Sequence, residues 1–274
     1  GTARGASPGM YVEGDPMEEQ LLTAWLCFWL AVLGAVFGSF LDCAASRWAG
    51  GDPHPFAGRS RCASCGHVLG ARDLVPVFSF LVRRGRCGYC GEKIPIECLI
   101  AELAGAAGFV CLGLRFGPSL ELGQWLACAA LLLALSLTDR AARVIPDKLL
   151  LLLAANRAVW FFVLGHGVRE VLESAKALAV PAVLLALVLG MEKLLGREAM
   201  GGGDIKLLFV LALYLSWAEL FLTLLAGCLL GLLWAALTGG KRGTAMPFGP
   251  FLALGAMLTV CCGGPVLTWY FGLF

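Results

Sequence analysis

Two aspartates stand at the edges of apolar runs, where a carboxylate is costly and is therefore a functional candidate. Asp139 ends one long apolar run, and Asp204 opens another directly after Gly201, Gly202 and Gly203. We expect the two carboxylates to meet in the fold. In such a pair, one carboxyl keeps its proton as a general acid while the other takes a proton from water. This chemistry is suited to peptide hydrolysis without a metal.

Each acid also has a simpler interpretation. Asp139 could end a helix and pair with Arg140 or Arg143, and Asp204 could cap the start of a helix. The three glycines favour a site at Asp204, because they allow close backbone approach to a ligand. For Asp147, at the start of another apolar run, we favour capping of exposed amides. Ion or proton transport is an equal alternative when only the physics of intramembrane acids is considered.

The elements that position these acids are expected to be membrane helices. Of the 274 residues, 59% are hydrophobic and 15% are charged, whereas roughly a quarter of a soluble domain is charged. Apolar runs of about 20 residues can cross a bilayer as helices. We interpret residues 21–45, 97–114, 120–138, 147–165, 171–195, 204–216, 217–238 and 248–273 as spans, of which the sixth is short. The sequence predicts an all-α polytopic membrane protein with about eight transmembrane helices, and not a soluble protein or a β-barrel.

The basic residues give this bundle an orientation. Sixteen of the 21 lie in loops on one side of the predicted bundle, eight of them between the first two spans, and three lie on the other side. Because basic loops stay in the cytoplasm, this split predicts that both termini lie outside. The loop between the first two spans, Asp139 and Asp204 then lie on the cytoplasmic side.

Four of the twelve cysteines form two Cys-x-x-Cys knuckles, Cys62 with Cys65 and Cys87 with Cys90, and a glycine follows each knuckle. Four thiolates suit a closed, structural Zn²⁺ site, although iron could occupy them too. Two disulfides are the alternative, which a reducing cytoplasm disfavours. A loop of this size needs a metal for stability. We assign the other eight cysteines to packing and His67 to the surface.

In their order and spacing, these motifs resemble the type IV prepilin peptidases, membrane aspartic proteases of the Gly-x-Gly-Asp type. The resemblance covers most of the chain, from about residue 34 to about residue 255. It rests on Gly38-Ser39-Phe40-Leu41, the two knuckles with the segment between them, the surroundings of Asp139 and Asp204, and Met246-Pro247-Phe248-Gly249-Pro250-Phe251.

The resemblance implies a protein of the bacterial inner membrane that removes the basic leader from prepilins or pseudopilins. Asp139 and Asp204 would be catalytic, and Cys62, Cys65, Cys87 and Cys90 would bind zinc. The glycines before Asp204, with Lys206, are expected to bind the substrate backbone. No nucleic acid is expected as a partner, so the partners are the pilin substrates and the lipid bilayer.

The resemblance also implies N-methylation of the cleaved product with S-adenosyl-L-methionine. Gly85 and Glu102 match family-type positions and are expected to bind this cofactor. Asp42 stands where the family usually has Asn, and Glu97 and Cys98 depart from its pattern after the second knuckle. These departures weaken the case for methyl transfer and leave the protease aspartates untouched. A peptidase without methyl transfer is therefore one alternative, and a transporter or membrane scaffold with a zinc docking module is another.

The chain divides into four expected parts. Residues 1–20 form a flexible polar tail, and residues 21–47 form the first transmembrane helix. Residues 48–96 form a cytoplasmic four-cysteine, zinc-binding loop domain, which the resemblance connects with methyl transfer. Residues 97–274 form the transmembrane aspartic protease core.

Overall fold

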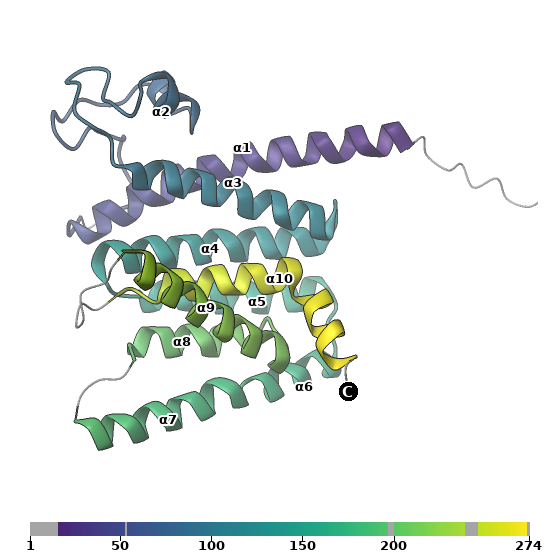
Figure 1. Ribbon diagram of the computed structural model, residues 1–274. Helices are drawn as coiled ribbons and strands as arrows, with labels where there is room; N and C mark the ends of the chain where they lie inside the picture. The colour runs from purple at the N-terminus through teal and green to yellow at the C-terminus, as the bar shows by residue number, and fades with distance from the viewer. Residues whose placement is uncertain (1–15, 53, 197–199, 239–245, 273–274) are drawn as a thin grey trace, which may run out of the picture.

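The computed structural model describes residues 16–52, 54–196, 200–238 and 246–272. The regular elements of these residues are all helices, joined by turns and loops, and no β-strand occurs among them. The elements are α1 Pro16–Ala49, η1 Ala71–Asp73, α2 Phe78–Val82, α3 Ile96–Phe116, α4 Leu120–Ala142, α5 Asp147–Val163, α6 Val168–Ala177, α7 Ala179–Leu195, α8 Gly202–Leu211, α9 Trp217–Thr238 and α10 Gly249–Phe271. The long helices lie roughly side by side, and the cysteine loop extends from one end of the bundle, which we call the loop end (Figure 1).

Six stretches in the described part of the chain are long and apolar enough to cross a membrane: α1, α3, α4, α6 with α7, α9 and α10. The predicted all-α membrane fold is thus confirmed, and the chain is a multi-pass membrane protein. The number of eight spans is not confirmed. α5 has 17 residues and α8 only 10, and 10 helical residues extend only about 15 Å.

The structure differs from the predicted boundaries at two places. α1 begins at Pro16, so residues 16–20 belong to a helix and not to the polar tail, while residues 1–15 lie outside the described part. Glu18 and Glu19 in the first turn favour this early start, since acids stabilise the positive end of a helix. The predicted span 171–195 is divided between α6 and α7 at Leu178.

Glycines hold the first two long helices together. A Cβ atom added at Gly34 of α1 would overlap the carbonyl oxygen of Gly105 in α3, and one added at Gly38 would overlap that of Ala101. Small residues permit such close backbone contact between membrane helices. α1 and α3 therefore form a rigid base for the loop that connects them.

α8 lies between α7 and the layer formed by α5, α9 and α10, and it begins at the loop end (Figure 1). Leu207 and Leu208 on this helix are completely buried, and Leu211 is 1% exposed. Just beyond the helix, the carbonyl oxygen of Leu213 accepts hydrogen bonds from Arg157 Nε of α5 at 2.8 Å and from Ser174 Oγ of α6 at 3.3 Å. Packing and hydrogen bonds thus fix the helix that carries Asp204.

Candidate active site

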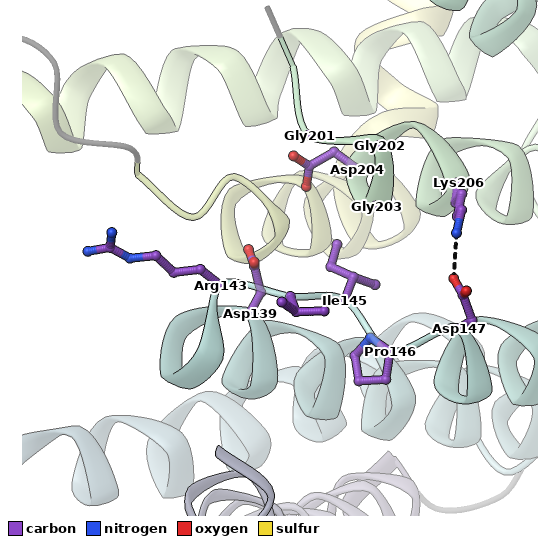
Figure 2. A pocket seen from close by; sticks show the side chains of 11 residues that line it. Asp139, Arg143, Ile145, Pro146, Asp147, Gly201, Gly202, Gly203, Asp204 and Lys206 are labelled. Atoms are coloured by element: carbon purple, nitrogen blue, oxygen red, sulfur yellow. Dashed lines mark hydrogen bonds and ion pairs between the residues drawn. The ribbon is translucent and has the colours of Figure 1, made fainter. Parts of the chain in front are cut away.

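Asp139 and Asp204 line the same cavity, as the sequence predicts. This cavity of about 400 Å³ lies at the loop end, between the end of α4, the connection to α5 and the start of α8 (Figure 2). The carboxylates come from opposite walls (Figure 2). All six residues predicted to act in catalysis or to bind substrate line it, namely Asp139, Asp204, Gly201, Gly202, Gly203 and Lys206.

Asp139 lies in the last turn of α4 and is 6% exposed. Its Oδ2 atom accepts a hydrogen bond of 3.0 Å from the backbone N–H of Gly249. Gly249 is the first residue of α10, where N–H groups have no partner within the helix and the positive end of the helix dipole favours an anion. The start of α10 therefore orients this carboxylate and stabilises its charge.

Gly249 is a site residue that our sequence analysis did not assign. A Cβ atom at this position would lie 2.7 Å from Asp139 Oδ2, too close for any side chain. The sequence feature that could have identified Gly249 is the motif from Met246 to Phe251. We used this motif for the resemblance but gave its glycine no role. Its contact with Asp139 joins residues 110 positions apart.

Asp204 lies in the first turn of α8 and is half-buried. Burial, and to a smaller extent the negative charge of Asp139, raise the pKa of its carboxyl to about 6. A carboxyl with such a pKa keeps its proton at mildly acidic pH, where an ordinary aspartate has lost it. The cavity therefore favours one shared proton between the two acids.

The nearby charges pair with groups other than the two aspartates. Arg140 points to Asp42 of α1 and Glu97 of α3, at 3.3 Å and 3.7 Å, and so does not neutralise Asp139. Asp147 lies in the first turn of α5, where the helix dipole favours an acid as we expected, but no backbone N–H in the described part of the chain donates to its carboxylate. Its Oδ1 atom accepts a hydrogen bond from Lys206 Nζ at 2.7 Å (Figure 2).

The three glycines before Asp204 have different surroundings. A Cβ atom at Gly201 would lie 3.1 Å from Asp204 Oδ2, and one at Gly203 would lie 3.0 Å from the Cβ atom of Ile145. Gly202 faces open space. Close packing thus disfavours a side chain at two of these positions, while the third leaves backbone accessible beside the acids.

The four knuckle cysteines come together in the loop. Their sulfur atoms all lie within 4.8 Å of one another, and the Sγ atoms of Cys62 and Cys90 are 3.9 Å apart. Ligands around tetrahedral zinc are about 3.8 Å apart when each Zn–S bond is about 2.3 Å. The four cysteines are free thiols, and backbone N–H groups of Cys65 and Ser64 lower the pKa of Cys62 to about 6. This donor set fits a metal.

The knuckles have the local geometry that their sequence predicts. Gly66 and Gly91 have φ values of 71° and 74°, which side chains rarely tolerate. In each knuckle the glycine N–H returns to the carbonyl oxygen of the first cysteine, at 2.9 Å and 3.0 Å. The exposed His67 stacks on Tyr89 at 3.6 Å between ring centroids, so it connects the two knuckles from the surface.

A second cavity of about 760 Å³ lies between this loop and the loop ends of α1 and α3. Acids and arginines both line it, including Asp42, Asp73, Glu102 and Arg61. Of the two residues predicted to bind the methyl donor, Glu102 lines the cavity and Gly85 does not. Gly85 lies against the ring of Phe80, where a Cβ atom would come within 3.0 Å.

Comparisons with known proteins agree with this architecture. Residues 32–116 match the Bacterial Peptidase A24 N-terminal domain, and residues 126–236 match the Type IV leader peptidase family. No solved structure matches the chain.

Several curated relatives carry the name prepilin leader peptidase/N-methyltransferase. The one from Bacillus subtilis is 34% identical over 256 residues, which is 88% of this chain and 96% of the relative. The one from Pseudomonas aeruginosa is 31% identical over 93% of this chain and 97% of the relative. The one from Pseudomonas putida is 35% identical over 76% of this chain and 73% of the relative. These matches, the paired aspartates and the four-cysteine loop confirm the resemblance seen in the sequence, and the chain belongs to the type IV leader peptidase family.

Proposed function

We propose that this protein is an aspartic endopeptidase that cleaves the basic leader from prepilins or pseudopilins. The observation that carries the proposal is that Asp139 and Asp204 line the same cavity, at the loop end of a membrane bundle. The names of the relatives support the substrate class.

The two carboxyls have different roles in this mechanism. Asp204, whose pKa is about 6, holds the shared proton and gives it to the oxygen of the scissile carbonyl. Asp139, whose Oδ2 atom accepts the hydrogen bond from the Gly249 N–H, takes a proton from the attacking water. The carbon–nitrogen bond then breaks as the proton on Asp139 goes to the leaving amine, and a hydroxyl group of the tetrahedral intermediate returns its proton to Asp204 as the new carboxyl group forms. The exposed backbone at Gly201 and Gly202 is placed to pair with an extended substrate.

The orientation follows from charge. The basic loops, the cysteine loop and the aspartate cavity share one end of the bundle, which we place in the cytoplasm of a bacterial inner membrane, with the termini outside. A pilin whose apolar helix lies in the bilayer would present its basic leader at that height. The scissile bond would then meet the two acids without leaving the interface.

We further propose that the loop domain holds Zn²⁺ at Cys62, Cys65, Cys87 and Cys90 and serves N-methylation. S-adenosyl-L-methionine supplies a methyl group on a positively charged sulfur. The second cavity suits such a ligand, because the carboxylates of Asp42 and Glu102 line it and offer partners for positive charge. Glu102 also accepts a hydrogen bond from the backbone N–H of Val77 at 2.6 Å, which ties the loop domain to α3.

Co-expression with a prepilin, followed by mass analysis of the product, tests both activities. We expect Asp139→Asn and Asp204→Asn to leave the prepilin uncut, with the protein still in the membrane. Glu173→Gln, at an exposed acid of α6, is the control and is expected to cut normally. Complete leader removal by either aspartate variant would refute the peptidase mechanism. A cleaved but unmethylated product with the unchanged protein would refute only the methyl transfer.

A further inference from the structure

The loop domain exposes a cluster of apolar side chains around α2, which we call the α2 face. Phe78, Leu81 and Val82 are 64%, 62% and 65% exposed. Leu74 and Val75, just before the helix, are 43% and 44% exposed. Water-soluble surfaces rarely gather large apolar side chains in this way without a partner.

The position of α2 along the membrane normal suggests what covers this face. Val77, directly before α2, is bound through its N–H to Glu102. Glu102 lies six residues into α3, or about 9 Å from its start at a rise of about 1.5 Å per residue. α3 has 21 residues and so matches a hydrocarbon core of about 30 Å. α2 therefore starts beside the membrane-spanning part of α3 and not above it.

The surroundings of α2 fit this height. Figure 1 shows α2 beside the loop end of α3, on the side away from α4. Ile96, Ile100 and Leu103 on α3 are 53%, 57% and 48% exposed, as expected for a helix face in contact with lipid.

Basic residues flank the apolar cluster. Arg72 precedes it and Arg84 follows it, and both are exposed. Arginine next to apolar side chains is the composition of segments that lie in a membrane interface, because anionic headgroups attract the charges. Asp73, the one acid in this segment, already contacts Arg83.

We propose that the α2 face is a membrane anchor of the loop domain. Phe78, Leu81 and Val82 contact acyl chains of the leaflet at the loop end, and Arg72 and Arg84 bind anionic phospholipid headgroups. The anchor fixes the depth of the loop domain relative to the membrane surface. It also fixes the position of Leu74 and Phe80, which line the second cavity.

Site-specific photo-crosslinking tests this anchor. The full-length protein carries p-benzoylphenylalanine in place of Phe78, in nanodiscs that contain phosphatidylglycerol and phosphatidylcholine, with excess prepilin added. We expect mass adducts with phospholipid. The same label at Phe162, which is 80% exposed on α5, should also capture lipid, whereas at Tyr89, 54% exposed on the second knuckle, it should not. The proposal would be overturned if position 78 formed adducts with prepilin or with a second copy of the chain. It would also be overturned if position 78 formed no adducts while position 162 captured lipid.

Lipid charge tests the role of the arginines. Crosslinking at position 78 is expected to fall severalfold in nanodiscs without phosphatidylglycerol. In the Arg72→Gln, Arg84→Gln variant the yield should be low in both lipid mixtures. A yield that is independent of phosphatidylglycerol in the unchanged protein would overturn the assignment of the headgroup contact.

Discussion

The aspartate cavity and the cysteine cluster are assembled in different ways. The cluster takes its four sulfurs from one loop, and the turns that place them are local hydrogen bonds. The cavity joins the end of α4, the start of α8 and the start of α10, which are far apart in the chain. The cluster should therefore depend on its metal, and the cavity on helix packing. Changes that disturb one of the two regions and leave the other intact test this difference.

Apart from changes to the two aspartates themselves, the largest effect is expected from Gly249→Ala. The added methyl group would lie 2.7 Å from Asp139 Oδ2 and displace the carboxylate. A shift of about 1 Å in a catalytic group can cost about 100-fold in rate, so we expect a loss of that size in leader cleavage, measured as kcat/KM. Gly190→Ala on α7, where nothing lies within 4 Å of an added Cβ atom, is the matched control for a glycine-to-alanine change. Equal losses in both variants would show that Asp139 is not held by α10.

Metal removal should act on the other region. Chelation, or Cys62→Ser with Cys87→Ser, is expected to loosen the loop domain, because a small four-thiolate domain depends on its metal for stability. Methyl transfer to a pre-cleaved pilin should fall by about 10-fold to 100-fold, as for disturbed metal sites, while cleavage changes little. Metal analysis and limited proteolysis of the loop accompany both assays. Collapse of cleavage together with methylation would mean that the two regions are not separable.

Acidity should distinguish the two activities as well. The pKa of Asp204 is raised to about 6, so its proton is present below that pH and is lost as the pH rises through it. With both carboxyls ionised the pair has no acid, and we expect cleavage to fall about tenfold per pH unit above the transition. Methyl transfer to a pre-cleaved pilin is measured over the same range and should lack this decline. A cleavage rate that stays flat well above the transition would contradict the shared proton.

A small effect is expected at the junction of the two regions. Asp42 lines the large cavity and pairs with Arg140, the neighbour of Asp139. Asp42→Asn should lower cleavage by about twofold to fivefold, since ion pairs with a solvent-exposed partner contribute only about 1 kcal/mol or less. Glu173→Gln, which breaks the exposed pair with Lys176, is the control. A loss as large as that of Gly249→Ala would mean that Arg140 positions the catalytic acid.

Local signals and distant contacts were not equally predictable from the sequence. The knuckles could be predicted because spacing and glycine position determine their turns. The meeting of Asp139 and Asp204 could be predicted because a membrane leaves few places for a carboxylate. The contact of Gly249 with Asp139 could not, since it involves a backbone N–H whose partner depends on how α10 packs on α4. The sequence indicated that the apolar stretch from residue 204 to 216 is short, but not that α8 ends at Leu211, because an apolar run does not reveal where its helix ends.

The central claim is that Asp139 and Asp204 act as one unit on one water molecule. A double-mutant cycle in kcat/KM for leader cleavage tests it most directly, with Asp139→Asn, Asp204→Asn and the double variant compared. Residues that act as a unit are strongly non-additive, so the double variant should be no slower than the slower of the two single variants. Losses that multiply in the double variant would show that the two acids work independently and would contradict the account.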